Sequence, residues 1–534
     1  MKKYHVMKAL TALKPCMVIK PVMALLTVVG LSSSVVSYAV DQRLFDLPEP
    51  TRSVMNKTNS SNNTNTAVTQ RTMGLATTLE VPDLGAAPSL FEQQQERKVG
   101  EMVLREVGKQ MPLYEDAWTQ DEINKVFSRI YTTASIGAPL GLVLIEDNSI
   151  NAFAVPGGLF ALNTGLILSA RTIDEIAGVM GHEVAHVSQR HYSRSKDAFK
   201  NQAWLTLGGM LASILLASQS SDAAGAVALG TQAAMLDRQL SYSRNQEREA
   251  DRVGMQLMYA AGYNPLAMAD FFEVMNRKTG SISYMPDFWL THPLSSERMS
   301  EARLRAAQYP KQRVELNLTQ EQTLRLMQYR IEILTDQMTQ ARLMTAAQRD
   351  PVAVLALAMW YTKQGQYDLA RTMSSQAETK LASLRLGSLS IVSITRANIE
   401  LKANQPQQAL DILLPKHRVA PENRALAIET ARAYIALNQG QAALDILQPF
   451  SQNNPRDVLV WQQMEAAANR LANSEFKTLQ VLRFRAENLF WRGEVDTAIK
   501  SLIRAGNLAK NNYSMQVRIE SRLKEMQEAR QFRP

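Results

Sequence analysis

Apolar residues recur at helical spacing in the middle of the chain. In Ile173–Arg190 they return every three or four positions, which predicts a largely buried amphipathic helix. The apolar positions of this helix are Ile173, Ile176, Ala177, Val179, Met180 and Val184. In residues 242–261, Val253, Leu257 and Ala261 share one face. A second central helix is therefore predicted there.

Short apolar runs before the first of these helices predict a small sheet. Residues 141–146 form one run, and another ends at the turn-forming residues 156–158 (PGG). The second run consists of Asn151, Ala152, Phe153 and Ala154. These strands could be plain scaffold, but an exposed edge strand can also bind a peptide through main-chain hydrogen bonds. Residues 151–154 are therefore the candidate substrate strand.

A repeated alanine pattern organises the last third of the chain. Pairs of alanines twelve residues apart recur four times, and the step from Ala397 to Ala431 is 34 residues. The pairs are Ala358/Ala370, Ala397/Ala409, Ala431/Ala443 and Ala486/Ala498. Small residues at such spacing let paired helices pack closely, so the pattern resembles tetratricopeptide repeats, with a degenerate unit near Trp461. We expect stacked helix pairs with a concave surface for peptides or partner proteins; an irregular helical domain is the alternative.

The first 87 residues differ from the rest in composition. Residues 1–39 combine lysines, an apolar run at Val22–Leu31 and small residues up to Ala39, which is typical of a signal peptide cut after Ala39. The run is short for a membrane span and is followed by three serines. Residues 40–87 are polar and partly of low complexity, so a linker is expected there.

Composition limits the classes of partner. With 534 residues, the chain is expected to hold two or three domains. Removing the signal peptide takes away five lysines and lowers the formal charge from +9 to about +4, which is too weak to indicate nucleic acid binding. The only cysteine, Cys16, lies in the same segment, so the exported chain needs no disulfide.

An apolar insert separates the two central helices. Residues 204–217 are mostly apolar, and small residues continue to residue 234. The run is short for a membrane span, so a buried or interfacial helix is expected. Peripheral contact with a membrane and a lid over a nearby site both stay open as interpretations.

The first central helix contains the pattern His182-Glu183-Val184-Ala185-His186. Residues four apart on a helix lie on one face, so His182 and His186 can bind one zinc ion. Glu183 lies beside that face and can take a proton from a water on the metal. Two chance histidines are the alternative, but their spacing within an apolar helix favours zinc.

A zinc site with two histidines needs at least one further protein ligand. The second central helix carries Glu247, Glu249 and Asp251. Glu247 is the best candidate, although spacing alone does not exclude Glu249, and a solvated charged face is the alternative interpretation. Asp251 lies four residues after Glu247 and could accept a hydrogen bond from a zinc-bound histidine.

A loop histidine could complete the site. His292 precedes a proline, which more often marks a surface position, but a loop that returns to the zinc would give it a role. It could then stabilise an oxyanion as a catalytic residue, or bind the metal as a fourth ligand. Arg298 follows and could pair with a nearby carboxylate.

Four motifs in one order resemble the HtpX-type zinc metallopeptidases. They are NAFAVPGG at residues 151–158, GHEVAH at 181–186, EREAD at 247–251 and THP at 291–293. The resemblance covers about residues 88–305. It implies one zinc ion held by His182, His186 and Glu247, with Glu183 as general base.

The expected fold is α+β, mainly α. A zincin-like metallopeptidase domain with a small sheet is followed by an all-α solenoid of tetratricopeptide repeats. The expected divisions are a signal peptide (1–39), a polar linker (40–87), the peptidase domain (88–310), connecting helices (311–348) and the repeats (349–530).

This order of segments resembles a periplasmic branch of the family that acts in outer-membrane β-barrel assembly. The resemblance implies a periplasmic zinc endopeptidase with chaperone-like activity that degrades misassembled substrates. It implies unfolded or misassembled outer-membrane proteins and the outer-membrane β-barrel assembly machinery as partners. One alternative is a repeat scaffold or chaperone whose peptidase site is normally inhibited. A weaker one is a zinc hydrolase of cell-wall or small-molecule substrates.

Overall fold

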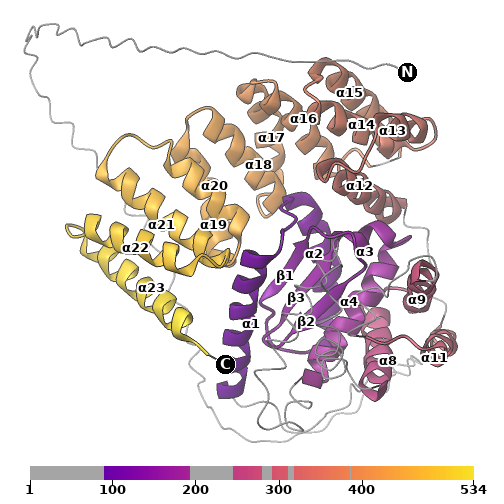
Figure 1. Cartoon of the computed structure of the whole chain (residues 1–534). Coiled ribbons are helices and arrows are strands. Elements are labelled where there is room, and N and C mark those ends of the chain that lie inside the picture. The colour runs from indigo at the N-terminus through magenta and orange to yellow at the C-terminus, as the bar shows by residue number, and fades with distance from the viewer. Residues whose placement is uncertain (1–89, 193–243, 280–291, 311–317, 385, 534) are drawn as a thin grey trace, which may run out of the picture. The chain divides into compact units, whose positions relative to one another are not determined.

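The computed structural model describes residues 90–192, 244–279, 292–310, 318–384 and 386–533. The expected signal peptide, the polar linker and the apolar insert at 204–234 lie outside these residues. None of the described helices has the length and hydropathy that crossing a membrane requires. The fold is mainly helical with one small sheet, as the sequence predicts (Figure 1).

The first part of the chain, up to residue 310, contains the sheet and the two central helices; we call it the peptidase part. Its strands are β1 (Gly141–Ile145), β2 (Ala152–Val155) and β3 (Leu159–Asn163), in the order β1-β3-β2. Its helical elements are α1 (Leu90–Gln110), α2 (Ala117–Tyr131), the 3₁₀ turn η2 (Thr132–Ala134), α3 (Thr164–Ser169), α4 (Ile173–Ser188), α8 (Arg244–Ala260), α9 (Leu266–Thr279) and α11 (Ser296–Ala306).

β2 lies at one edge of the sheet. It pairs antiparallel with β3, with Phe153 opposite Ala161, and β1 pairs parallel on the other side of β3. Gly157 and Gly158 make the tight turn between β2 and β3 with φ of 85° and 78°, a region that favours glycine. All four β2 side chains are buried, and the strand begins one residue after Asn151, the first residue of the predicted run.

Two glycines let α4 and α8 touch through their backbones. A Cβ atom added to Gly254 would lie 2.9 Å from the carbonyl carbon of Gly181, and one added to Gly181 would lie 3.0 Å from the Gly254 oxygen. Thr172 caps α4 by accepting a hydrogen bond from Glu175 N at 3.2 Å, so the helix starts where the pattern predicts. This close crossing brings the face of α4 that carries His182 against α8.

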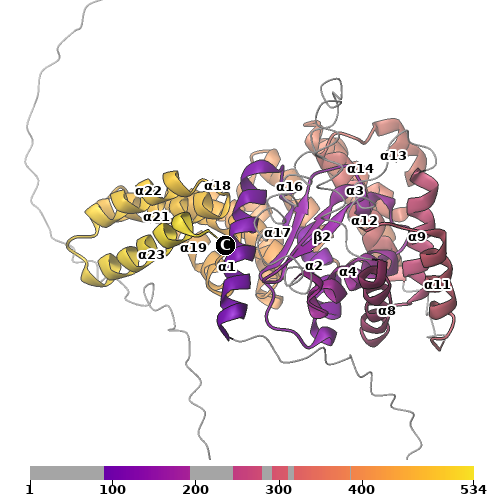
Figure 2. The same ribbon diagram turned by 60° about the horizontal axis from the view of Figure 1, so that its bottom comes forward.

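The rest of the chain forms a helical array, α12 to α23. In it α12 packs against α14, and from α13 onward each helix packs against the next (Figure 2). All eight alanines of the predicted pairs are fully buried, because they lie where paired helices meet. The helices are α12 (Leu318–Leu334), α13 (Gln340–Ala347), α14 (Pro351–Lys363), α15 (Tyr367–Ser383), α16 (Ser390–Lys402), α17 (Pro406–Val419), α18 (Arg424–Ala436), α19 (Gly440–Asn453), α20 (Val458–Ala468), α21 (Glu475–Trp491), α22 (Val495–Leu508) and α23 (Tyr513–Gln531).

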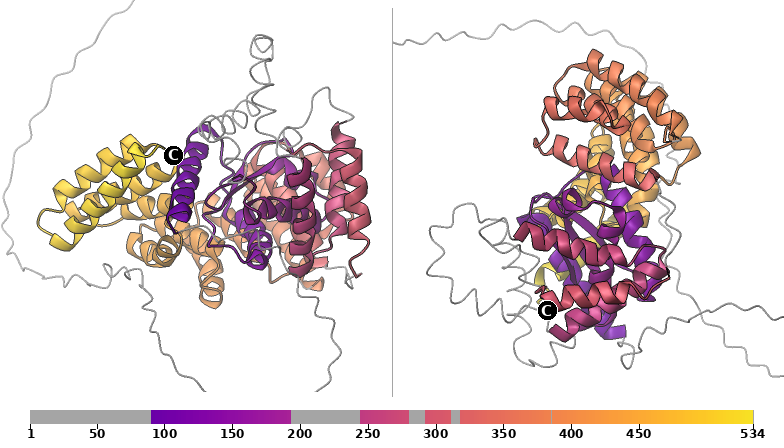
Figure 3. Two further views of the ribbon diagram at one scale, coloured as in Figure 1. Left: turned by 90° about the horizontal axis from the view of Figure 1, so that it is seen from below. Right: turned by 90° about the vertical axis from the view of Figure 1, so that its right-hand side faces the viewer.

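Ion pairs join the helical array to the peptidase part. Arg330 of α12 donates to Asp116 Oδ2 at 2.6 Å, and both side chains are buried. Asp116 is also the N-cap of α2, where its Oδ1 accepts from Thr119 N. Arg424 of α18 lies 3.1 Å from Asp121 of α2. At the other end of the array, α1 packs against α21, and the left view of Figure 3 shows the indigo α1 beside the yellow C-terminal helices.

Candidate zinc site

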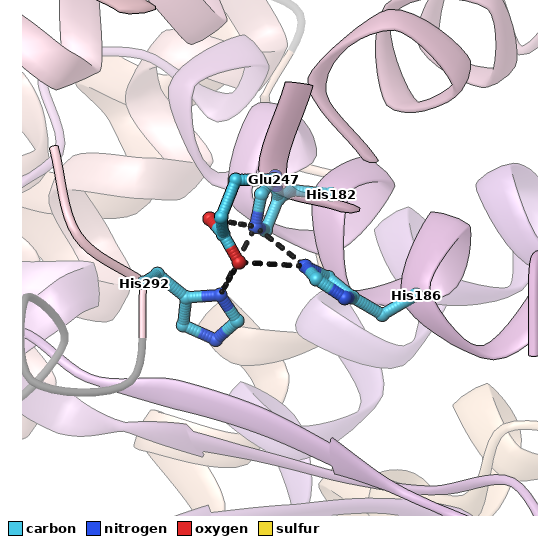
Figure 4. Close-up of side chains that lie close together, drawn as sticks. All are labelled: His182, His186, Glu247 and His292. Carbon is cyan, nitrogen blue, oxygen red and sulfur yellow. Dashed lines mark hydrogen bonds and ion pairs between the residues drawn. The ribbon is translucent and has the colours of Figure 1, made fainter. Parts of the chain in front are cut away.

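Four side chains that are far apart in the sequence meet in one buried cluster (Figure 4). His182 and His186 come from consecutive turns of α4, Glu247 from the first turn of α8, and His292 from the segment before α11. Each is at most 3% exposed. One nitrogen or oxygen from each residue lies within 4.8 Å of all the others, so the group could hold a metal ion.

The spacing of these atoms fits a tetrahedral zinc ion. Ligands about 2.0–2.1 Å from one ion at tetrahedral angles lie about 3.3–3.4 Å from each other. His182 Nε2 is 3.0 Å from His186 Nε2 and 3.2 Å from His292 Nδ1. Glu247 Oε1 is 3.4 Å from His186 Nε2 and 3.0 Å from His292 Nδ1. These separations and the mixed nitrogen–oxygen donors are those that zinc prefers.

Asp251 and Arg298 fix the orientation of two of these residues. Asp251 Oδ1 lies 2.9 Å from His182 Nδ1, so a proton on Nδ1 leaves the Nε2 lone pair directed at the cluster. Arg298 Nε donates to Asp251 Oδ2 at 2.6 Å, and Nη1 lies 2.5 Å from Glu247 Oε2. Burial opposes the ionisation of Glu247, but His292 and Arg298 hold its pKa well below the usual range. The carboxylate is therefore charged, as a zinc ligand must be.

His191 supports the second histidine in the same way, although no motif in the sequence singles it out. Its Nδ1 lies 2.9 Å from His186 Nδ1, and its Nε2 lies 3.1 Å from Glu249 Oε2. Arg190 has a left-handed φ of 52°, which ends α4 and folds the fully buried His191 back against it. Spacing alone also allowed Glu249 to be the acidic zinc ligand. In the structure Glu249 contacts His191 and is not part of the four-residue cluster.

We expect His191→Gln to weaken zinc binding by about 10- to 100-fold, the usual cost of losing a group that orients a metal ligand. The zinc affinity is measured by competition with a chromophoric chelator. His417→Gln, the same change in α17 of the helical array, is the matched control and should leave the affinity unchanged. Equal zinc affinities for the two variants would contradict a supporting role for His191.

Glu183 lies beside the cluster and has the environment of a general base. It is buried, and burial raises the pKa of its carboxyl group. The main chain of Ala154 in β2 forms a hydrogen bond with this carboxylate, which places the edge strand next to it. Its Oε1 accepts no hydrogen bond from the described residues and lies 3.4 Å from His292 Nε2. Such a carboxylate can accept a proton from water at neutral pH.

Comparisons with known proteins agree with this geometry. The profile of peptidase family M48 matches residues 117–306. The beta-barrel assembly-enhancing protease of Escherichia coli (strain K12) is 30% identical over 461 residues, which cover 85% of this chain and 93% of the relative. The putative beta-barrel assembly-enhancing protease of Vibrio cholerae is 29% identical over 466 residues, which cover 84% of this chain and 92% of the relative. The mitochondrial metalloendopeptidase OMA1 of Schizosaccharomyces pombe is 30% identical over 211 residues. These residues cover 39% of this chain and 59% of the relative.

Proposed function

Because the chain belongs to peptidase family M48 and is a zinc metalloendopeptidase, the open question is which proteins it cuts. We propose that it degrades unfolded or misassembled outer-membrane β-barrel proteins. The observation that carries the proposal is the extent of the match. Relatives that are named beta-barrel assembly-enhancing proteases align along both the peptidase part and the helical array. The OMA1 relatives align over at most two fifths of this chain. A scaffold with a silent peptidase site is less favoured, because the relatives are named as proteases or endopeptidases.

We propose that His182, His186 and Glu247 bind the zinc ion. Their donor atoms face one another at distances that suit zinc, and Glu247 is charged in the folded chain. Asp251 and His191 hold the two imidazoles in orientation from outside.

Zinc, when bound, supplies a Lewis acid that polarises the scissile carbonyl and makes water more acidic. Glu183 accepts the proton of the attacking water on Oε1 and later delivers it to the leaving amine. The raised pKa of Glu183 suits both steps, because the group must take up and release a proton near neutral pH. Burial of the cluster excludes competing bulk water.

The substrate is proposed to lie along β2, with Asn151, Ala152, Phe153 and Ala154 as its neighbours. Two observations support this position. β2 is an edge strand, and the main chain of Ala154 contacts the carboxylate of Glu183. A peptide added to this edge would bind through main-chain hydrogen bonds, which suits substrates that share no sequence.

His292 is proposed as a fourth zinc ligand that must leave before a substrate carbonyl can enter. The Nδ1 atom of His292 lies 3.2 Å from His182 Nε2 and 3.0 Å from Glu247 Oε1, so it stands among the proposed ligand atoms. A residue that only stabilises the oxyanion would not need to stand among them. We expect His292→Ala to raise kcat on an unfolded protein about tenfold or more while zinc is retained. A fall in kcat with zinc retained would instead assign His292 to oxyanion stabilisation, and an unchanged kcat would exclude both roles.

The helical array is proposed to present substrates to the site and to contact the outer-membrane β-barrel assembly machinery. Stacked helix pairs provide an extended surface for such partners. We propose that the protein acts in the periplasm, where proteins bound for the outer membrane pass.

The substrate class can be tested with one outer-membrane β-barrel protein in two states. Zinc-loaded full-length protein and its His292→Ala variant are incubated with the barrel diluted from urea and with the same barrel folded in detergent. We expect both to cut only the unfolded form, and the variant to cut faster. Cleavage of the folded form alone, or of neither form by either enzyme, would contradict the proposed substrate class.

A further inference from the structure

Arg298 of α11 is a buried arginine that contacts the zinc site on one side and the main chain next to His292 on the other. The residue is 3% exposed. Its Nε and Nη2 donate to the two carboxylate oxygens of Asp251 at 2.6 Å and 2.9 Å. Its Nη1 lies 2.5 Å from Glu247 Oε2 and donates to the carbonyl oxygen of Pro293 at 3.1 Å. One guanidinium group therefore joins α8 to residues 292 and 293, which we call the His292 segment.

The donors of this guanidinium group divide between the two sides. Nε and Nη2 bind Asp251 bidentately, and neither of these bonds involves the His292 segment. Nη1 carries two N–H groups, and the acceptors around it are Glu247 Oε2 and the carbonyl oxygens of Pro293 and His292, the last at 3.5 Å. If the segment moved away, both bonds to Asp251 would stay and the bond to Pro293 would break. The bond from Nη1 to Pro293 therefore depends on where the segment lies.

Two further contacts hold Arg298 itself in place. Ser295 is the N-cap of α11 and accepts a hydrogen bond from Arg298 N at 3.1 Å, so the helix begins at a fixed point after the His292 segment. The guanidinium carbon lies 5.2 Å from the ring centre of Phe272 in α9. Arg303 also joins α11 to Asp270 of α9 at 2.9 Å, but an exposed pair of this kind contributes little. The buried contacts of Arg298 therefore dominate the position of the segment.

His292 depends on this segment for its position. The other three members of the buried cluster stand on α4 and α8, whereas His292 lies before the first residue of α11 (Figure 4). Its Nδ1 lies 3.0 Å from Glu247 Oε1, and Arg298 Nη1 lies 2.5 Å from the other oxygen of the same carboxylate. A shift of the segment would separate His292 from the proposed ligands and break the Pro293 bond in one movement.

We propose that Arg298 is a positioning residue that holds His292 among the zinc ligands and so sets how often the fourth coordination position opens to a substrate. This inference rests on the proposed role of His292 as a fourth ligand. A hydrogen bond from a charged donor changes an equilibrium by about tenfold or more, so its loss should increase the released fraction of His292 by about that factor. Arg298 thereby regulates cleavage through His292, without itself touching the reacting atoms.

The first test measures the release of His292 without any substrate. Arg298→Lys keeps a positive charge beside Asp251 but lacks the planar fork that reaches Asp251 and Pro293 together. Zinc-loaded full-length protein is treated with diethyl pyrocarbonate, and the modification of each histidine is followed by peptide mass spectrometry. We expect His292 to react about tenfold faster in Arg298→Lys than in the parent. His417 of the helical array should react at the same rate in both.

The second test asks whether Arg298 acts through His292. The kcat on an unfolded protein is measured for the parent, Arg298→Lys, His292→Ala and the double variant. Arg298→Lys should raise kcat about threefold or more when His292 is present and should not raise it in the His292→Ala background, where no ligand is left to release. Equal ratios in the two backgrounds, or an unchanged rate of His292 modification, would overturn the proposal.

His292→Ala alone separates this inference from the function on which it rests. If that variant does not raise kcat, the fourth-ligand role of His292 fails. If it does raise kcat but Arg298→Lys has the same effect in both backgrounds, only the role of Arg298 fails. Arg303→Lys is the matched control, because Arg303 is an exposed arginine on the same helix, and it should leave kcat and His292 modification unchanged.

Ser295→Ala decides the question if Arg298→Lys unfolds or loses zinc, which thermal unfolding and elemental analysis show. This change removes the N-cap that aligns Arg298 and leaves every proposed zinc ligand in place. We expect His292 to react faster than in the parent, by a smaller factor than in Arg298→Lys. Ser474→Ala removes the equivalent cap from α21 of the helical array and should have no effect. Equal His292 modification in the two serine variants would overturn the proposal.

Discussion

Replacing Glu183 by glutamine is expected to lower kcat by about 10²- to 10⁴-fold, the usual contribution of a general acid–base residue. Glutamine keeps the shape of the side chain but has no carboxylate to accept a proton. Glu183 is not among the four residues whose donor atoms meet, so zinc content should stay at one ion per chain. Steady-state cleavage of an unfolded protein and elemental analysis of zinc measure the two quantities.

The matched control for this prediction is Glu297→Gln. Glu297 is an exposed carboxylate in the first turn of α11, close in sequence to His292. Its replacement by glutamine should leave kcat unchanged. The assignment of Glu183 as the base fails if its glutamine variant keeps more than a tenth of the parental kcat. It also fails if activity is lost only because zinc is lost.

Replacing Glu247 by alanine is expected to reduce zinc affinity by more than about 100-fold. This loss is larger than the one usually caused by removing a residue that only hydrogen-bonds to a metal ligand. The substitution deletes a charged ligand from a site with two imidazoles. Arg298 keeps its two hydrogen bonds to Asp251, so the local fold retains its main ion pair. Activity at low zinc should fall in parallel and recover in part when zinc is added in excess.

Glu249→Ala provides the comparison, because spacing alone allows either glutamate to be the ligand. Glu249 contacts His191, which in turn contacts His186, so its loss should cost less zinc affinity than the loss of Glu247. A larger effect at Glu249 would reverse the assignment. Competition with a chromophoric chelator gives both affinities on one scale.

Local periodicity predicted the elements on which the site is built. The apolar spacing from Ile173 onward identified α4 at its first residue, and the alanine pairs identified helices that meet at fully buried positions. Both patterns reflect contacts that recur along one helix, so a single sequence can reveal them. His182, His186 and Glu247 were expected to meet, because a metal site with two histidines needs an acidic partner. His292 was expected to join them only if its loop returned to the site, and the structure brings all four together.

Contacts between distant segments could not be predicted in this way. The crossing of Gly181 with Gly254 depends on how two helices approach, and isolated glycines carry no signal of that approach. His191 stands outside the four-residue spacing, and its place beside His186 depends on the left-handed backbone at Arg190. The sequence suggests a carboxylate partner for Arg298, but its hydrogen bond to the Pro293 carbonyl depends on how that segment returns to the site.

The most direct test of zinc binding by His182, His186 and Glu247 is anomalous diffraction at the zinc edge from crystals of the zinc-loaded wild-type protein. We predict a single peak about 2.0–2.1 Å from Nε2 of both histidines and from the Glu247 carboxylate. Glu183 should lie outside bonding distance of this peak. A peak centred on His191 and Glu249, or the absence of a peak among the three proposed ligands, would contradict the account.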